Sequence, residues 1–167
     1  MQTELQIGDE IAIQPSKNTF TYNGPYLPIT DIVYVTSHLG IIPILQMLNV
    51  ILSSSSNTVK SVSIIWINDD LSHFEVAYEE LEKFYQKYSK TLDVCCIYME
   101  DLQLKDTFVV DKKDAAKSSL KEMEDSIPIF SKGTMAVVSG PVGFVKKMDK
   151  YLQFEKGYPD NCMSLLP

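Results

Sequence analysis

The sequence contains no arginine, and all fifteen of its basic residues are lysines. A chain without arginine has no bidentate guanidinium clamp for phosphate or carboxylate groups, although lysines still act as point charges. Its 22 acidic residues outnumber the lysines and give a formal net charge of −7. This acidic balance argues against a general nucleic-acid binder, which needs a basic surface to neutralise phosphates. We therefore expect no nucleic-acid partner.

Cysteine and histidine are also scarce. The three cysteines, of which Cys95 and Cys96 are adjacent, do not form the paired framework of a secreted protein. Neighbours on a strand point to opposite faces, so both are expected to be buried small hydrophobes in a reducing, intracellular compartment, either cytoplasm or mitochondrion. The two histidines, His38 and His73, match no zinc-ligand spacing with these cysteines. No metal site is predicted.

Long apolar runs are missing as well. The most apolar segment runs from Ile41 to Leu52, and Gln46 and Asn49 interrupt it. It is shorter than the roughly 20 residues that a membrane-spanning helix needs. No transmembrane segment is predicted, and the N-terminus has no signal-peptide pattern. With 167 residues and 45% hydrophobic content, the chain can bury one sizeable core.

From residue 31 onward, strand-like and helix-like segments alternate. Strands are predicted at 32–36, 61–67, 92–99, 134–138 and, briefly, 163–165. Helices are predicted at 43–52, 73–89, 115–123 and 142–152. Strands separated by helices of this length imply right-handed crossovers in a parallel sheet. The sequence predicts an α/β fold, namely a doubly wound, mostly parallel five-stranded sheet of Rossmann-like type, preceded by a short N-terminal β segment.

Two strand–helix junctions carry a family resemblance. The first reads His38-Leu39-Gly40-Ile41-Ile42-Pro43 and is followed by Ile44-Leu45-Gln46-Met47-Leu48. The second reads Val137-Val138-Ser139-Gly140-Pro141. They resemble the Gly-Thr-Gly-Ile-Thr-Pro and Cys-Gly-Pro-Pro elements of the pyridine-nucleotide lobe of the ferredoxin–NADP reductase superfamily, nearest its cytochrome-b5 reductase branch. The order and spacing of these elements match over nearly the whole chain.

This resemblance implies a site for NAD(H) at the carboxyl ends of the strands. The residues expected to frame it are His38, Gly40, Ile41, Pro43, Asn68, Asp70, Ser139, Gly140 and Pro141. NAD is expected rather than NADP, because no arginine is available for a 2′-phosphate. Residues 1–30 would be the end or remnant of a flavin lobe with its connector, and residues 31–167 the NAD-binding-like domain. FAD is not expected to bind to this chain alone, which has no room for a flavin-binding barrel.

The departures from the family pattern bear on function. Ser37, His38 and Leu39 replace two glycines and a threonine of the phosphate loop, and Ser139 replaces the family cysteine near the point of hydride transfer. Backbone N–H groups must approach a pyrophosphate closely, and side chains on these residues obstruct that approach. His38 either donates to a phosphate or makes a local hydrogen bond. The run from Asn68 to Asp70 either binds a ribose or forms a turn, and His73 is expected at the surface.

These observations predict a degenerate, non-catalytic NAD-binding-like domain that acts as a structural or accessory subunit of a larger assembly, such as an electron-transfer complex. The alternative is a functional NAD(P)H-binding lobe that passes hydride to FAD held elsewhere. Whether the protein is an enzyme stays open between them. An unrelated flavodoxin-like module is disfavoured, because no hydroxyl-rich phosphate loop follows the first predicted strand.

Overall fold

The structure is a computed structural model, and it describes residues 29–53, 58–99, 107–111, 114–118 and 120–167. The predicted N-terminal β segment, and most of the predicted remnant of a flavin lobe, lie outside the described residues.

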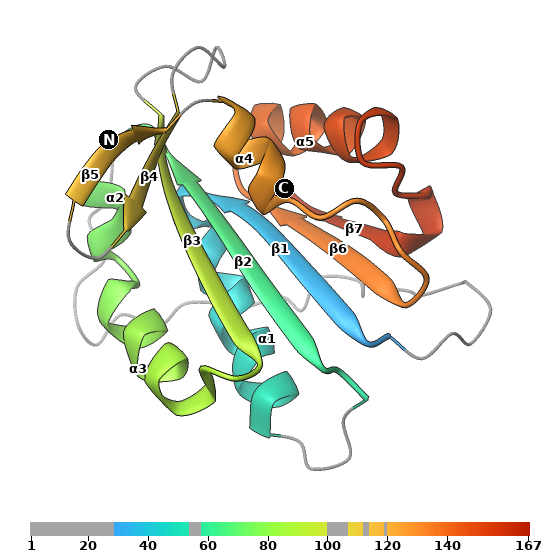
Figure 1. Cartoon of the computed structure of the whole chain (residues 1–167), viewed down its shortest axis with the longest axis horizontal. Helices are drawn as coiled ribbons and strands as arrows, with labels where there is room; N and C mark the ends of the chain where they lie inside the picture. Colours follow the sequence, from blue (N-terminus) through green and yellow to red (C-terminus); the bar gives the residue numbers. More distant parts are fainter. Residues whose placement is uncertain (1–28, 54–57, 100–106, 112–113, 119) are drawn as a thin grey trace, which may run out of the picture.

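A single sheet of seven strands organises the described part of the chain (Figure 1). Its order is β5-β4-β3-β2-β1-β6-β7. The strands are β1 (Asp31–Ser37), β2 (Ser61–Asn68), β3 (Leu92–Met99), β4 (Thr107–Asp111), β5 (Asp114–Ser118), β6 (Thr134–Ser139) and β7 (Met163–Leu166). Five neighbouring strands are parallel to one another, in the order β3, β2, β1, β6 and β7. β4 and β5 form an antiparallel hairpin that extends the sheet beside β3. The predicted α/β class and its five parallel strands are confirmed.

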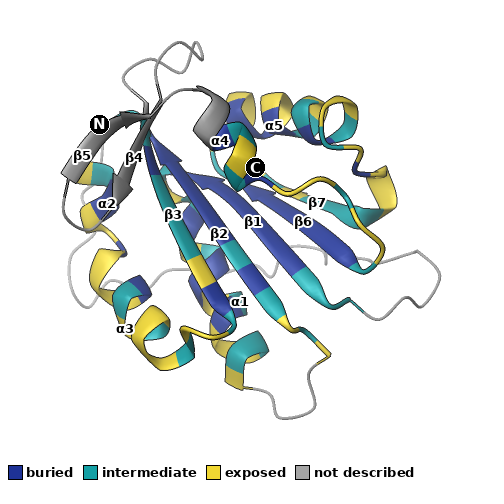
Figure 2. Ribbon diagram, viewed as in Figure 1, coloured by how far each residue is buried: buried dark blue, intermediate teal, exposed yellow. Residues whose placement is uncertain are grey.

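The central strands are apolar on both faces because helices cover both. β1 and β6 are buried along almost their whole length, as the dark blue ribbons in Figure 2 show. Side chains alternate between the faces, so that Val33 and Val35 contribute to one core and Ile32 and Tyr34 to the other. Such continuous runs of Val, Ile and aromatic residues are typical of parallel strands buried on both sides.

Helices on opposite faces build the two cores. α1 (Ile41–Ser53), α2 (Ser72–Glu75) and α3 (Tyr78–Tyr88) cover one face, where Leu48 and Leu81 are buried. α4 (Leu120–Ser126) and α5 (Val142–Phe154) cover the other, where Met123 and Leu152 are buried. Two short 3-10 turns, η1 (His38–Gly40) and η2 (Asp160–Cys162), precede α1 and β7. None of the helices in the described ranges is long and apolar enough to cross a membrane.

The strand order reverses between β1 and β6. β1 pairs with β2 on one side and with β6 on the other, and the helices after β1 and β6 cover opposite faces. The two connections therefore leave the carboxyl edge in opposite directions. Ligands of open α/β sheets bind at this topological switch point.

Two predicted helices are wrong in part. Residues 115–118 form β5 and only 120–126 form α4, because the segment pairs with β4 as a hairpin, which overrides helix propensity. The predicted helix over 73–89 is two helices, since Ala77 leaves helical geometry at φ −139° and is buried against the sheet. Cys95 and Cys96 pack against opposite cores as predicted, although both are only partly buried.

Candidate functional site

The turn between β1 and α1 is built around an unusual backbone conformation at His38. Its φ of +52° is left-handed, and no other non-glycine residue in the described ranges has a positive φ. This conformation costs a residue with a side chain about 1 kcal/mol, which explains why the resembling family has glycine at this point. His38 therefore holds a backbone conformation that suits glycine, and it adds an imidazole at this point of the loop.

Three hydrogen bonds hold His38 in place. Its backbone N–H donates to Asn68 Oδ1 at 2.7 Å, and its carbonyl accepts from Trp66 Nε1 at 3.3 Å. Its ring Nδ1 lies 2.7 Å from Ser37 Oγ. Each such bond contributes about 1 kcal/mol and together they offset the backbone strain. The local hydrogen bond considered for His38 is therefore present, and the backbone polar groups of His38 are used within the protein.

The turn between β6 and α5 packs directly against this loop. A Cβ atom on Gly40 would lie 2.5 Å from the carbonyl oxygen of Ser139 and 2.7 Å from the nitrogen of Gly140. A Cβ on Gly140 would lie 2.9 Å from the carbonyl oxygen of Ser37, and the φ of Gly140 is +146°. Real Cβ contacts are not this short, so both glycines are required for the two loops to touch.

The end of β2 completes the carboxyl edge. Asn68 is 1% exposed, and its amide nitrogen has no hydrogen-bond partner among the described residues. Asp70 is exposed and its Oδ1 accepts from both the backbone N–H and the hydroxyl of Ser72, each at 2.8 Å. These hydrogen bonds, first the backbone one, lower the pKa of the Asp70 carboxyl. The run from Asn68 to Asp70 was expected either to bind a ribose or to form a turn, and the hydrogen bonds of Asp70 to Ser72 are those of a turn.

The nine residues expected to frame a dinucleotide all lie at or near the carboxyl edge, but few present a side chain to solvent. Ile41, Asn68 and Ser139 are at most 2% exposed. Pro43 lies within α1 and Pro141 is the exposed residue before α5. No acidic side chain occupies the first turn of α1 or α5, so the positive ends of both helices are free of a neutralising carboxylate. The ligand contacts of all nine residues stay a prediction.

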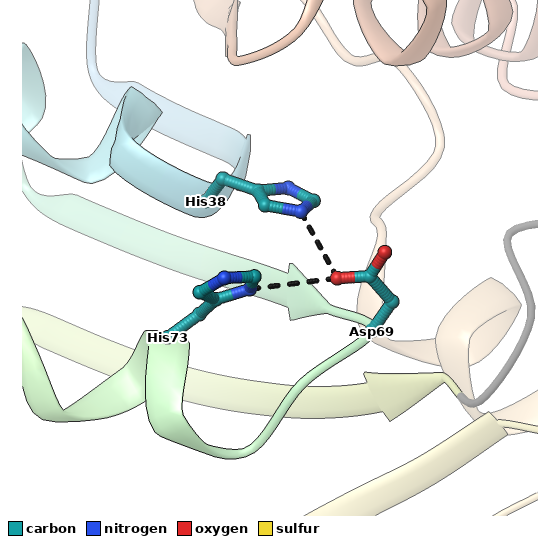
Figure 3. Close-up of side chains that lie close together, drawn as sticks. All are labelled: His38, Asp69 and His73. Carbon is teal, nitrogen blue, oxygen red and sulfur yellow. Dashed lines mark ion pairs between the residues drawn. The ribbon is translucent and has the colours of Figure 1, made fainter.

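A cluster that the sequence analysis missed lies beside this edge (Figure 3). His38 Nε2 is 2.9 Å from Asp69 Oδ1, and His73 Nδ1 is 3.4 Å from the same oxygen. The two imidazole centroids are 4.5 Å apart, with the ring planes tilted by 48°. The signal was present in the sequence: His38 and Asp69 follow adjacent parallel strands, and Asp69 and His73 are four positions apart. Only the order of the strands in the sheet could show that His38, Asp69 and His73 lie together.

An apolar groove of about 570 Å³ lies on the α1 side of the sheet. Tyr34 lies at the groove, and its hydroxyl is 3.9 Å from Met47 Sδ. The lining is Ile29, Ile32, Tyr34, Pro43, Gln46, Met47, Val50, Ile51, Met135 and Val137. With a single amide and no charge in its lining, this groove suits an apolar surface and not a phosphate.

Solved structures share this architecture. The CS–b5R domains of human Ncb5or in the NAD⁺ form match with a TM-score of 0.63 and 16% identity, over 84% of this chain and 37% of that one. The cytochrome b5 reductase domain of Ulva prolifera nitrate reductase matches with a TM-score of 0.65 and 17% identity, over 83% and 49%. A flavohemoglobin from Malassezia yamatoensis with bound FAD and heme matches with a TM-score of 0.59 and 17% identity, over 84% and 32%.

These matches confirm the predicted resemblance at the level of the fold. The described part of the chain therefore shares the fold of the matching regions of these three structures. It spans less than half the length of each of these three structures. No protein-family model matches the sequence, and no curated protein is similar to it in sequence.

Proposed function

We propose that the chain is a non-catalytic form of the NAD-binding lobe and acts as a structural or accessory part of a larger protein or assembly. The observation that carries this proposal is the burial of Ser139. This residue stands where the resembling family has its cysteine near the point of hydride transfer, and it is 2% exposed. Gly40 also packs against the Ser139 carbonyl, so the residue is covered from the side of the β1–α1 loop.

The loop before α1 supports the same conclusion. A phosphate-binding loop needs free backbone N–H groups and small side chains. Here the N–H of His38 is bonded to Asn68, and the next residue, Leu39, is 66% exposed. Ile42, in the first turn of α1, is 39% exposed. Two exposed apolar side chains therefore lie at the helix end where a pyrophosphate would bind.

The apolar groove beside α1 favours a protein partner. An uncharged groove of about 570 Å³ on a sheet face is suited to receive apolar side chains from another domain or subunit. Cys95, Cys96 and Cys162 form no disulfide bond within the described residues, which fits a reducing compartment. Any flavin in such an assembly would be held outside this chain.

A second candidate function is NAD(H) binding, with hydride passing to a flavin held elsewhere. One observation favours it: the backbone of His38 is left-handed, a conformation that suits the glycine which the resembling family has at this point. The backbone of the loop thus accepts a glycine at this position, although its present side chains oppose a dinucleotide. Asn68 lies beside this loop at the end of β2, where a ribose contact is expected.

Titration with NADH and NAD⁺ separates the two functions. We expect no rise in melting temperature, no heat of binding and no NADH-dependent reduction of added FAD, because the loop side chains obstruct a dinucleotide. The titration extends to about 5 mM nucleotide, since a Kd in the millimolar range is the weakest that a cofactor site can usefully have. Native mass spectrometry of the protein from its source cells should show it in a larger species. A Kd below about 100 µM for NADH, or reductase activity, would contradict the proposal and support the second candidate.

A double variant, His38→Gly with Leu39→Thr, serves as a matched control. It restores the glycine and threonine of the family pattern at a position whose φ already suits glycine. We expect this variant to bind NADH more tightly than the natural chain. Such a gain would show that the assay detects binding and that the loop side chains prevent it.

A further inference from the structure

We propose that His38, Asp69 and His73 form a binding site for a divalent first-row transition-metal cation, for which Zn²⁺ is the probe. The three side chains come from three elements: the η1 turn, the loop after β2, and α2 (Figure 3). The ligating atoms all lie within 4.8 Å of one another. They include both histidines of the chain.

Hydrogen bonding does not account for this arrangement. Asp69 Oδ1 and His73 Nδ1 are buried, and neither has a hydrogen-bond partner among the described residues, although imidazole nitrogens lie 2.9 and 3.4 Å from that oxygen. Buried polar atoms without a partner cost free energy. A cation placed between the three atoms would satisfy both orphaned atoms at once.

The separations of these atoms suit a common metal ion. Zinc bonds to nitrogen and oxygen of about 2.0–2.1 Å place two ligand atoms about 2.9 Å apart at a right angle and about 3.4 Å apart at the tetrahedral angle. The observed separations from Asp69 Oδ1 are 2.9 Å to His38 Nε2 and 3.4 Å to His73 Nδ1. Both separations from the Asp69 oxygen therefore suit a bound ion, and the three ligating atoms lie within 4.8 Å of one another.

The surroundings of His38 support a ligating role. Its other ring nitrogen, Nδ1, lies 2.7 Å from Ser37 Oγ, and Ser37 is completely buried. With Nδ1–H donating to this hydroxyl, the lone pair is on Nε2 and points at the cluster. Metal-binding histidines almost always have such a partner on the other nitrogen, which sets the tautomer and the ring orientation.

The donor set identifies the class of cation. Two imidazole nitrogens and one carboxylate oxygen are suited to zinc and to neighbouring transition metals, whereas Mg²⁺ and Ca²⁺ prefer oxygen ligands throughout. The side chains of His38, Asp69 and His73 are 25%, 35% and 38% exposed, so an ion can enter from solvent. Three protein ligands leave at least one coordination position open, and a bound ion would link η1 to α2.

Metal binding at this cluster does not depend on whether a dinucleotide binds, since it uses side chains that are already in place. The test uses the complete chain without an affinity tag, because a histidine tag would itself bind the probe. Isothermal titration with ZnCl₂ should show one ion per chain, and saturation at about 100 times the Kd should raise the melting temperature by about 5–10 °C. Co²⁺ should give visible d–d absorption without a thiolate charge-transfer band.

Two variants test the ligands, and a third is the matched control. We expect His73→Ala and Asp69→Asn each to weaken Zn²⁺ binding by about a hundredfold, since each removes one of three protein ligands. Asp93→Asn changes an exposed carboxylate near the start of β3, at the opposite end of the sheet, and should leave the affinity unchanged. Variants are compared only where their metal-free melting curves show a folded protein.

Nuclear magnetic resonance gives a readout that needs no variant. With two histidines in the chain, Zn²⁺ should shift the imidazole signals of both together, at a stoichiometry of one. The proposal is overturned if Zn²⁺ does not bind at about 1 mM, if neither imidazole signal moves, or if a thiolate band shows that cysteines are the ligands. Unchanged affinity in folded His73→Ala and Asp69→Asn would overturn it equally.

Discussion

Gly40 and Gly140 decide how closely the two loops at the carboxyl edge approach. Each faces the other loop at a distance where a Cβ would overlap with backbone atoms, which cannot move away as the end of a flexible side chain could. The hydrogen atoms of glycine are the largest substituents that fit. Both glycines of the family resemblance are therefore explained by packing between the loops, and neither requires a bound nucleotide.

Substitution of Gly40 by alanine should destabilise the protein by about 3 kcal/mol, at the upper end of what overpacking costs. The new methyl group would lie 2.5 Å from the Ser139 carbonyl oxygen and force the two junction loops apart. Urea unfolding followed by circular dichroism measures the difference.

Gly143→Ala is the control for this change. Gly143 lies in the first turn of α5, and nothing lies within 4 Å of a Cβ built on it. Alanine there should stabilise the protein by about 0.5–1 kcal/mol through helix propensity. Equal effects of the two substitutions would show that loop contact is not what Gly40 provides.

At the scale of elements, α2 is a single helical turn whose start is stabilised by hydrogen bonds to the carboxylate of Asp70. Asp70 Oδ1 accepts two hydrogen bonds from Ser72, and His73 in the same turn belongs to the proposed metal site. Single turns are unstable alone, since helix formation needs several residues to repay nucleation. The position of His73 therefore depends on the carboxylate at position 70 as well as on the packing of Phe74, which is 8% exposed.

Replacing Asp70 with alanine should release α2 and leave α3 unchanged. The N–H of Ser72 would lose its acceptor, so amide hydrogen exchange of residues 72–74 should accelerate, whereas that of residues 81–88 should not. Acid should act in the same direction. Because the pKa of Asp70 is lowered in the folded state, its contribution is present above the ordinary value and is lost as the pH falls through the folded-state pKa.

Hydrogen exchange by mass spectrometry, at pH values corrected for the intrinsic exchange rate, measures this effect. Asp70→Asn keeps an oxygen acceptor without the charge and should protect α2 to an intermediate extent. Acceleration that spreads equally over α2 and α3 would mean that the two helices open as one unit.

At the scale of the whole molecule, each of the two cores contains a buried phenol. Tyr34 belongs to the core under α1, and Tyr158 to the core under α4 and α5, where its hydroxyl donates to the Pro128 carbonyl at 3.2 Å. Burial raises the pKa of Tyr34 to about 12. Burial, and secondarily the charge of Asp31, raises the pKa of Tyr158 to about 12.

Alkaline pH should therefore unfold the protein through both cores. Unfolded tyrosine has a pKa of about 10, so the unfolded chain releases these protons first and stability falls as the pH rises from about 10 to 12. Stability from these groups is fully present below pH 10. The loss should reach about 2 kcal/mol for each phenol, as measured by urea unfolding at a series of pH values.

Tyr34→Phe should lessen this alkaline loss with little effect at pH 7, since the Tyr34 hydroxyl donates to the Met47 sulfur across a long 3.9 Å. Comparison with Tyr158→Phe shows how much of the alkaline loss of stability comes from each of the two cores. Identical pH profiles for Tyr34→Phe and the natural chain would place the alkaline transition on other groups, such as the lysines.

Hydrophobic pattern alone determined most of the fold. The continuous apolar runs at 32–36, 61–67 and 134–138 predicted buried parallel strands, because burial on both faces leaves no polar alternation in the sequence. The helix over 115–118 was wrong because its strand pairing with β4 comes from a neighbour and not from its own composition. Local propensity is a weak signal where tertiary pairing competes with it.

The candidate functional site was determined partly by the sequence and partly by the tertiary structure. The two loop motifs in the sequence identified the carboxyl edge, and the replaced glycines marked it as altered. Only the tertiary structure showed that Ser139 is buried, that Gly40 contacts its carbonyl, and that His38 has a left-handed backbone. The convergence of both histidines on Asp69 was likewise decided by the pairing of β1 with β2, because spacing along a chain does not reveal which strand ends become neighbours.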